Sequence, residues 1–153
     1  MAIFLVQHGK SLSKELDPEQ RLSPEGISDV ERIADVARGY DVHVASISHS
    51  GKKRALQTAE IFYSALKPMG GVQEEIGLKP LDDVGAFADS LKSKDDLMIV
   101  GHLPFMERLI SFLITGDIEK PVLKFQNGGI VCLDERPEGK GWVIKWTLMP
   151  KIG

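Results

Sequence analysis

His8 is the residue of this sequence best placed to do chemistry. It follows the apolar run of residues 2–7 and stands directly before Gly9 and Lys10. A histidine at the end of a buried strand has an exposed imidazole, and a glycine behind it leaves room for an anion close to the backbone. The neutral imidazole is a covalent nucleophile that can attack phosphorus. Taken alone, His8 is more typical of a solvated histidine that ends a strand.

Two further residues suit the binding of a phosphoryl group. Arg54 lies just after Lys52 and Lys53 at the expected start of a helix, and its planar guanidinium matches a phosphate dianion. Free N–H groups at that helix start would add an anion-favouring pole. His102 follows an apolar run and could donate a hydrogen bond to a phosphoryl oxygen. The alternatives are a solvated basic patch and a core histidine at a strand end.

Short apolar runs and helical periodicity alternate along the chain. The apolar runs predict strands over residues 2–7, 42–48, 72–78, 97–100, 129–133 and 142–148. Apolar residues at helical spacing predict helices over residues 24–39, 52–66, 84–91 and 104–115, the first of them with Ser23 as N-cap.

This alternation predicts one α/β domain over residues 1–153: a three-layer α/β/α sandwich with a mainly parallel central sheet and a C-terminal antiparallel hairpin. In such sheets, ligands bind outside the carboxyl ends of the strands. His8, the segment 49–54 and His102 all follow predicted strands. We therefore expect three polar clusters to converge at one edge of the sheet.

The composition narrows the classes of function. The chain has 153 residues, a formal net charge of −3, and 42% hydrophobic and 27% charged residues, which is typical of a soluble globular domain. The acidic balance argues against a general nucleic-acid binder. Cys132 is the single cysteine, so neither an intrachain disulfide nor a cysteine-rich zinc site is expected. The sequence lacks a signal-peptide pattern and an apolar run long enough to span a membrane, and we expect a cytoplasmic protein.

Four segments together resemble a known family. Residues 5–11 (LVQHGKS) resemble the Arg-His-Gly signature of the histidine phosphatase superfamily, whose members share the phosphoglycerate mutase-like fold. Residues 22–26, 50–59 and 100–104 are similar to its later motifs, in the same order. The short chain resembles the SixA-like branch of phosphohistidine phosphatases in particular.

This resemblance implies a metal-independent phosphatase without a cofactor. His8 would be the nucleophile, Arg54 would hold phosphoryl oxygens, and His102 would donate a hydrogen bond to them. The remaining residues expected around the phosphate are Gln7, Gly9, Lys10, Arg21, His49 and Ser50. The substrate would be a protein that carries a phosphohistidine, or else a small phosphorylated molecule.

The sequence departs from the family pattern at Gln7, where the family has arginine. Gln7 can donate hydrogen bonds but carries no charge. A hydrogen bond to a charged group contributes about 1.5–3 kcal/mol, so its loss from a transition state slows a reaction by roughly one to two orders of magnitude. Lys10, Lys52 or Lys53 could compensate. Otherwise the chain would be a catalytically weakened module that binds phosphate or a partner protein.

Other departures surround the expected pocket. Arg21 lies one residue closer to the first helix than the corresponding SixA-like arginine, so it reaches the phosphate only if its loop is shifted. Gly51 replaces a proline, which predicts a looser helix entry, and His49 is an additional titratable group.

A general acid is not evident in the sequence. The acidic residues of the middle segment match no motif and are expected to be mostly solvated: Glu74, Glu75, Asp82 and Asp83. A phosphohistidine needs less acid assistance than a phosphate ester, because imidazole leaves more readily than an alkoxide. A carboxylate near the leaving group would instead favour a small-molecule phosphomonoesterase.

Overall fold

The structure is a computed structural model and describes residues 1–152. Its elements in chain order are β1 (Ile3–Gln7), α1 (Pro24–Gly39), β2 (Ser46–His49), α2 (Lys53–Leu66), β3 (Val72–Glu74), α3 (Val84–Asp89), the 3-10 turn η1 (Ser93–Asp95), β4 (Leu97–Gly101), α4 (Phe105–Thr115), β5 (Ile130–Glu135) and β6 (Trp142–Leu148).

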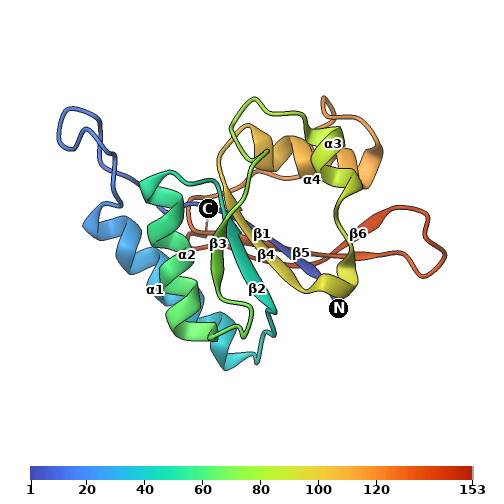
Figure 1. The fold of residues 1–153 in the computed structure, drawn as a ribbon, viewed down its shortest axis with the longest axis horizontal. Coiled ribbons are helices and arrows are strands. Elements are labelled where there is room, and N and C mark those ends of the chain that lie inside the picture. Colours follow the sequence, from blue (N-terminus) through green and yellow to red (C-terminus); the bar gives the residue numbers. More distant parts are fainter. Residues whose placement is uncertain (153) are drawn as a thin grey trace.

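The strands form one sheet in the order β3-β2-β4-β1-β5-β6. The pairs β3–β2, β2–β4 and β4–β1 are parallel, whereas β5 runs antiparallel to both β1 and β6. Figure 1 shows the turn between β5 and β6 projecting well beyond the sheet. The prediction of a mainly parallel sheet closed by a C-terminal antiparallel hairpin is therefore confirmed.

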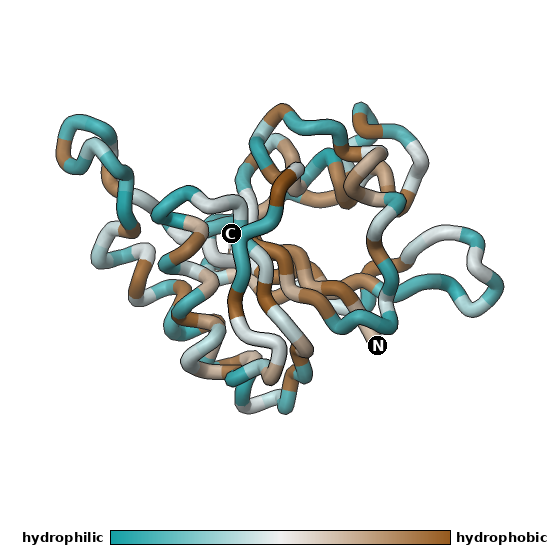
Figure 2. Tube along the Cα trace, in the orientation of Figure 1, coloured by the Kyte–Doolittle hydropathy of each residue, from teal (hydrophilic) through white to brown (hydrophobic). Residues whose placement is uncertain are grey.

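Helices cover both faces of this sheet. Alternate residues of β1 point to opposite faces: Phe4 and Val6 join the cluster beneath α1 and α2, while Ile3 and Leu5 join the cluster beneath α3 and α4. Figure 1 shows the two helix pairs on opposite sides of the strands, and Figure 2 shows hydrophobic residues concentrated along the strands. The three-layer α/β/α sandwich is confirmed.

The expected start of α1 is observed. The Ser23 side chain accepts a hydrogen bond from the Gly26 N–H (3.0 Å), and Pro24 occupies the first helical position. This capping satisfies one of the N–H groups that a helix start leaves free. The N-cap thereby sets where the long loop after β1 ends and the first covering helix begins.

Two strands are shorter than predicted. Residues 42–45 lie outside β2, because the Val42 N–H bonds back to Ala37 at the end of α1 and the Ala45 N–H bonds to Asp96. Strand β3 ends at Glu74, since the chain turns away at Gly77, whose φ is +94°. The first strand is shortened by contacts with the end of α1 and with Asp96, and the second by the turn at Gly77.

None of the helices within residues 1–152 combines the length and the apolar character needed to cross a membrane. Over the same residues, the structure holds no group of three or more His, Cys, Asp or Glu side chains suited to a metal ion.

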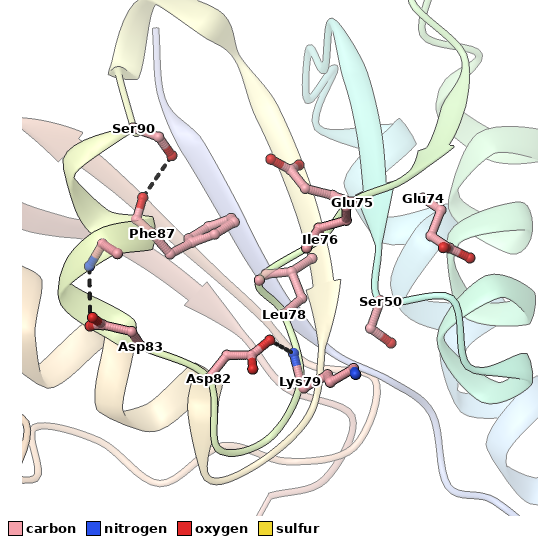
Figure 3. A pocket seen from close by; sticks show the side chains of 12 residues that line it. Ser50, Glu74, Glu75, Ile76, Leu78, Lys79, Asp82, Asp83, Phe87 and Ser90 are labelled. Atoms are coloured by element: carbon pink, nitrogen blue, oxygen red, sulfur yellow. Dashed lines mark hydrogen bonds between the residues drawn. The ribbon is translucent and has the colours of Figure 1, made fainter.

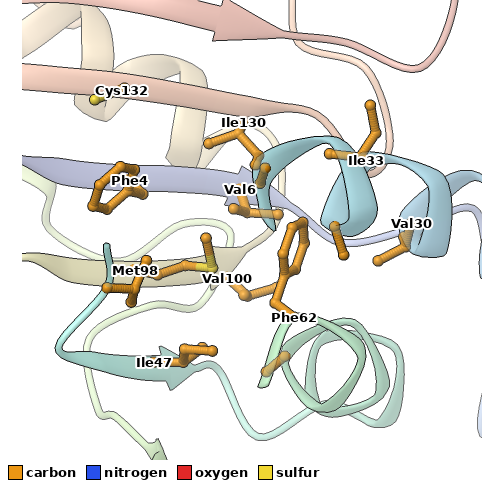
Figure 4. Packing of buried hydrophobic residues seen from close by; sticks show 14 of the residues in the cluster. Phe4, Val6, Val30, Ile33, Ile47, Phe62, Met98, Val100, Ile130 and Cys132 are labelled. Atoms are coloured by element: carbon orange, nitrogen blue, oxygen red, sulfur yellow. The ribbon is translucent and has the colours of Figure 1, made fainter. Parts of the chain in front are cut away.

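Phe62 is central to the packing of α2 on the sheet. Its side chain is fully buried and lies among Val6, Ile47 and Val100 in the cluster shown in Figure 4. We expect Phe62→Ala to lower the free energy of unfolding by about 3–5 kcal/mol, because it removes apolar contacts and leaves a cavity. Urea unfolding followed by circular dichroism measures this. The adjacent Tyr63 is 43% exposed, and an equal loss in Tyr63→Ala would contradict the role given to Phe62.

Candidate active site

Side chains from three parallel strands meet at the carboxyl edge of the sheet. His8 follows β1, His102 follows β4 and Ser50 follows β2. Parallel pairing of β1 with β4 continues up to Gln7 and Gly101, and the His8 N–H donates to the Gly101 carbonyl (3.0 Å). As a result, the rings of His8 and His102 lie with their centroids 4.8 Å apart, inclined at 54°.

The His8 ring is oriented by its own backbone neighbour. Nδ1 lies 2.7 Å from the Gly9 carbonyl oxygen. Because a carbonyl can only accept, Nδ1 must carry the proton and donate it. In the neutral ring the lone pair is then on Nε2, so Nε2 is the nitrogen available for nucleophilic attack.

Gly9 lets the end of β1 pack closely against the first two helices. A β-carbon at Gly9 would lie 2.8 Å from a methyl group of Val30 in α1. On the α2 side, the Gly9 N–H donates to the Thr58 hydroxyl (2.9 Å), and that hydroxyl donates to the Arg54 carbonyl (2.7 Å). This chain of hydrogen bonds ties the turn after His8 to the first turn of α2, where Arg54 lies.

His102 contacts Ser50 across the edge of the sheet. Its Nε2 lies 2.5 Å from the Ser50 hydroxyl oxygen, while Nδ1 is buried without a partner among the described residues. A proton on Nδ1 would leave a buried donor unsatisfied, which is rarer than an unsatisfied acceptor. We therefore infer that the proton is on Nε2 and that His102 donates to Ser50.

Both histidines are held in the neutral form. Burial lowers the pKa of His8 to about 4; its hydrogen bond to Gly9 opposes this shift, and the charge of Arg54 adds to it. Burial also lowers the pKa of His102 to about 3, reinforced by the charges of His8, Arg54 and Lys52. Arg54 and Lys52 are thus the basic side chains whose charges act on the histidine pair.

Two other basic residues expected at the site are engaged elsewhere. Lys10 pairs with Glu25 at the start of α1 (2.8 Å). The guanidinium of Arg21 pairs with Asp17 and Glu19 within the loop that follows β1. Figure 1 shows this loop extending away from the body of the molecule. Phosphate binding by Lys10 and by Arg21 stays a prediction that would require each to leave its acidic partner.

His49 and Gly51 shape the turn that leads into α2. Gly51 has a φ of +93°, and its N–H donates to Nδ1 of His49 (3.0 Å). The proline expected from the family pattern could provide neither that φ nor an N–H. This turn is hydrogen-bonded rather than loose. Burial lowers the pKa of His49, against the opposing charges of Glu74 and Glu60, so His49 is neutral in this turn.

Gln7 lies beneath the site. Its side chain is 8% exposed, and its Oε1 is buried without a hydrogen-bond partner among the described residues. Its backbone carbonyl accepts from the Gly128 N–H (2.8 Å). An unsatisfied buried amide oxygen is costly, so Gln7 lowers the stability of the protein at this position.

Sequence analysis did not identify Thr58 or Asn127 as part of this region. Thr58 lies within residues 50–59, which resemble a motif of the family, so the sequence could have marked it as a site residue. The Asn127 side chain donates to the His8 carbonyl (3.0 Å) across 119 positions of the chain. Such a contact has no signal in the local sequence.

The fold, unlike the sequence, has clear matches among known proteins. No family model matches the sequence, and no curated protein matches it significantly. Solved structures do match: the protein histidine phosphatase SixA in complex with tungstate aligns with a TM-score of 0.83 and 24% identity, over 98% of this chain and 97% of that one. The Entamoeba histolytica phosphoserine phosphatase in complex with 3-phosphoglyceric acid aligns with a TM-score of 0.68 and 16% identity, over 95% of each chain.

The chain therefore has the fold of the histidine phosphatase superfamily. The solved structures to which this chain is similar include those of SixA proteins. A second SixA structure, assigned as a phosphohistidine phosphatase of Agrobacterium tumefaciens, aligns with a TM-score of 0.76 and 22% identity, over 97% of each chain.

The lowered histidine pKa values predict how stability depends on pH. Between about pH 6.5 and pH 4 the unfolded chain binds protons at His8 that the folded chain does not, so the free energy of unfolding falls as the pH falls. We expect His8→Asn to lose less stability than wild type between pH 6.5 and pH 4.5, as measured by urea unfolding. The carboxylates titrate in both proteins, so the difference between the two losses of stability gives the contribution of His8. Equal losses in the two proteins would show that His8 has an ordinary pKa.

Proposed function

We propose that this protein is a phosphatase that acts through a phosphohistidine on His8, and that its substrate is a phosphohistidine on another protein. The observation that carries the proposal is the pairing of His8, with Nε2 free and the ring neutral, with His102 at the sheet edge beside Arg54. The fold shared with SixA supports it.

In the first step, Nε2 of His8 attacks the phosphorus atom and the P–N bond of the substrate breaks. When the substrate ring carries a proton on its other nitrogen, the leaving group is a neutral imidazole. No general acid is then required, which suits a site where, within residues 1–152, neither histidine ring is hydrogen-bonded to a carboxylate. The product of this step is a phosphoryl group on Nε2 of His8.

In the second step, water attacks the phosphorus atom of the His8 phosphoenzyme. The P–N bond to His8 breaks, inorganic phosphate leaves and the neutral imidazole is restored. Arg54 would stabilise the negative charge on the equatorial oxygens in both steps. In the resting protein the Nε2–H of His102 donates to Ser50. With substrate bound, it would donate to a phosphoryl oxygen instead. A bound dianion raises the pKa of both histidines and so strengthens His102 as a donor.

Lys52 is the basic residue that best compensates for Gln7. Its charge acts on His102, and its backbone N–H approaches the Ser50 hydroxyl (3.5 Å). Lys10 is paired with Glu25, and Lys53 is not among the charges that act on either histidine. We therefore favour Lys52 as the second cation near the phosphoryl position. A lysine acts as a point charge without the bidentate geometry of arginine, so the compensation would be partial.

We further propose that the protein works in the cytoplasm. Cys132 is buried, and burial raises the pKa of its thiol to about 11. A protonated thiol is a weak nucleophile, and a chain without disulfide chemistry suits a reducing compartment.

His8→Ala tests the nucleophile. We expect it to reduce hydrolysis of a phosphohistidine-bearing protein to the uncatalysed background and to abolish transfer of radiolabelled phosphate onto the protein. The measurements are phosphate release and acid-labile, alkali-stable label on the protein after rapid quenching. Background hydrolysis by wild type itself would sink the enzyme proposal. Turnover of a phosphate ester but not of phosphohistidine would favour the phosphomonoesterase alternative.

Gln7→Arg tests whether the missing cation limits the rate. We expect it to raise kcat/KM by about ten- to a hundredfold, because an arginine would add a charge-assisted hydrogen bond in the transition state. Gln7→Leu is the matched control, since it has similar volume and no polar group, and it should not gain activity. Tight phosphate binding without turnover in either wild type or Gln7→Arg would identify a binding module rather than an enzyme.

A further inference from the structure

A cleft of about 760 Å³ adjoins the histidine pair. Ser50 lines this cleft and also contacts His102, so the cleft begins where the phosphoryl position ends. Figure 3 shows the connection from β3 and helix α3 facing each other across it, with Ile76, Leu78 and Phe87 between them.

The charge of the cleft is opposite to that of the phosphoryl position. Its lining holds four carboxylates and one basic residue: Glu74, Glu75, Asp82, Asp83 and Lys79. None of the four carboxylates takes part in an ion pair within the described residues. The charges of Arg54 and Lys52 act instead on His102, which contacts Ser50.

Apolar side chains accompany this charge. Leu78 and Phe87 are buried and form the floor, whereas Ile76 is 95% exposed at the rim. Leu81, nearby on the connection to α3, is 80% exposed. An exposed apolar patch that is rimmed by polar residues is typical of a surface that binds another protein.

We propose that this acidic cleft docks a basic, partly apolar segment that flanks the phosphohistidine of the partner protein. The inference rests on the proposed function and specifies its substrate. The phosphoryl group binds on the cationic side of Ser50, while lysine or arginine side chains of the same segment meet the carboxylates of the cleft. A small, wholly anionic phosphometabolite would be repelled there, so the cleft also selects against such substrates.

Two phosphohistidine peptides of equal length, one flanked by lysines and one by glutamates, test the docking. We expect wild type to hydrolyse the basic peptide with a kcat/KM about tenfold higher at low salt, a preference that declines as salt is added. Glu75→Lys, which reverses one charge in the cleft, should reduce the preference to about threefold. Glu31→Lys on α1 makes the same charge change on the opposite face of the sheet, and its preference should match that of wild type.

The outcomes separate this inference from the proposed function. Equal hydrolysis of both peptides would overturn the docking and leave the phosphatase intact. If wild type hydrolyses neither peptide, the proposed function fails, and the affinities of His8→Ala for the two peptides still decide the docking by fluorescence anisotropy. A dimer that forms with rising concentration and is lost in Glu75→Lys would assign the cleft to a second copy of this chain and overturn the inference.

Discussion

Parallel pairing of β1 with β4 is the constraint on which the site depends. The register Gln7 opposite Gly101 brings His8 and His102 out of the sheet side by side. A slip of one residue would separate the rings, and it would also move Phe4 and Val6 to the wrong face of the sheet. The hydrophobic core therefore maintains the geometry of the histidine pair.

Burial gives the site its chemical character. It keeps His8 and His102 neutral at neutral pH, so the proposed nucleophile would need no base to deprotonate it. The nearby positive charges reinforce this effect and would also attract the phosphoryl dianion. The same charges thus favour a neutral nucleophile before binding and a stabilised anion after it.

Ser50 lies between two regions of different charge at the edge of the sheet. The charges of Arg54 and Lys52 act on His102, the partner of Ser50, whereas Glu75, Asp82 and Asp83 line the cleft that Ser50 also borders. Under the proposed function, this arrangement would place the phosphoryl group at the histidines and the flanking residues of the partner segment in the cleft.

The sequence by itself determined the succession of strands and helices along the chain, because apolar periodicity and capping are local properties. It also identified His8, Arg54 and His102 as candidates, since their positions after apolar runs already imply the carboxyl edge of a parallel sheet. Only the tertiary structure decided which nitrogen of His8 is free, that Ser50 contacts His102, and that Gly51 makes a hydrogen-bonded turn. It also decided that Arg21 pairs within its loop and that a carboxylate-lined cleft adjoins the site. The contact of Ser50 with His102 and the cleft join residues far apart in the chain, and the other features depend on the path of the loops, which hydrophobic periodicity does not encode.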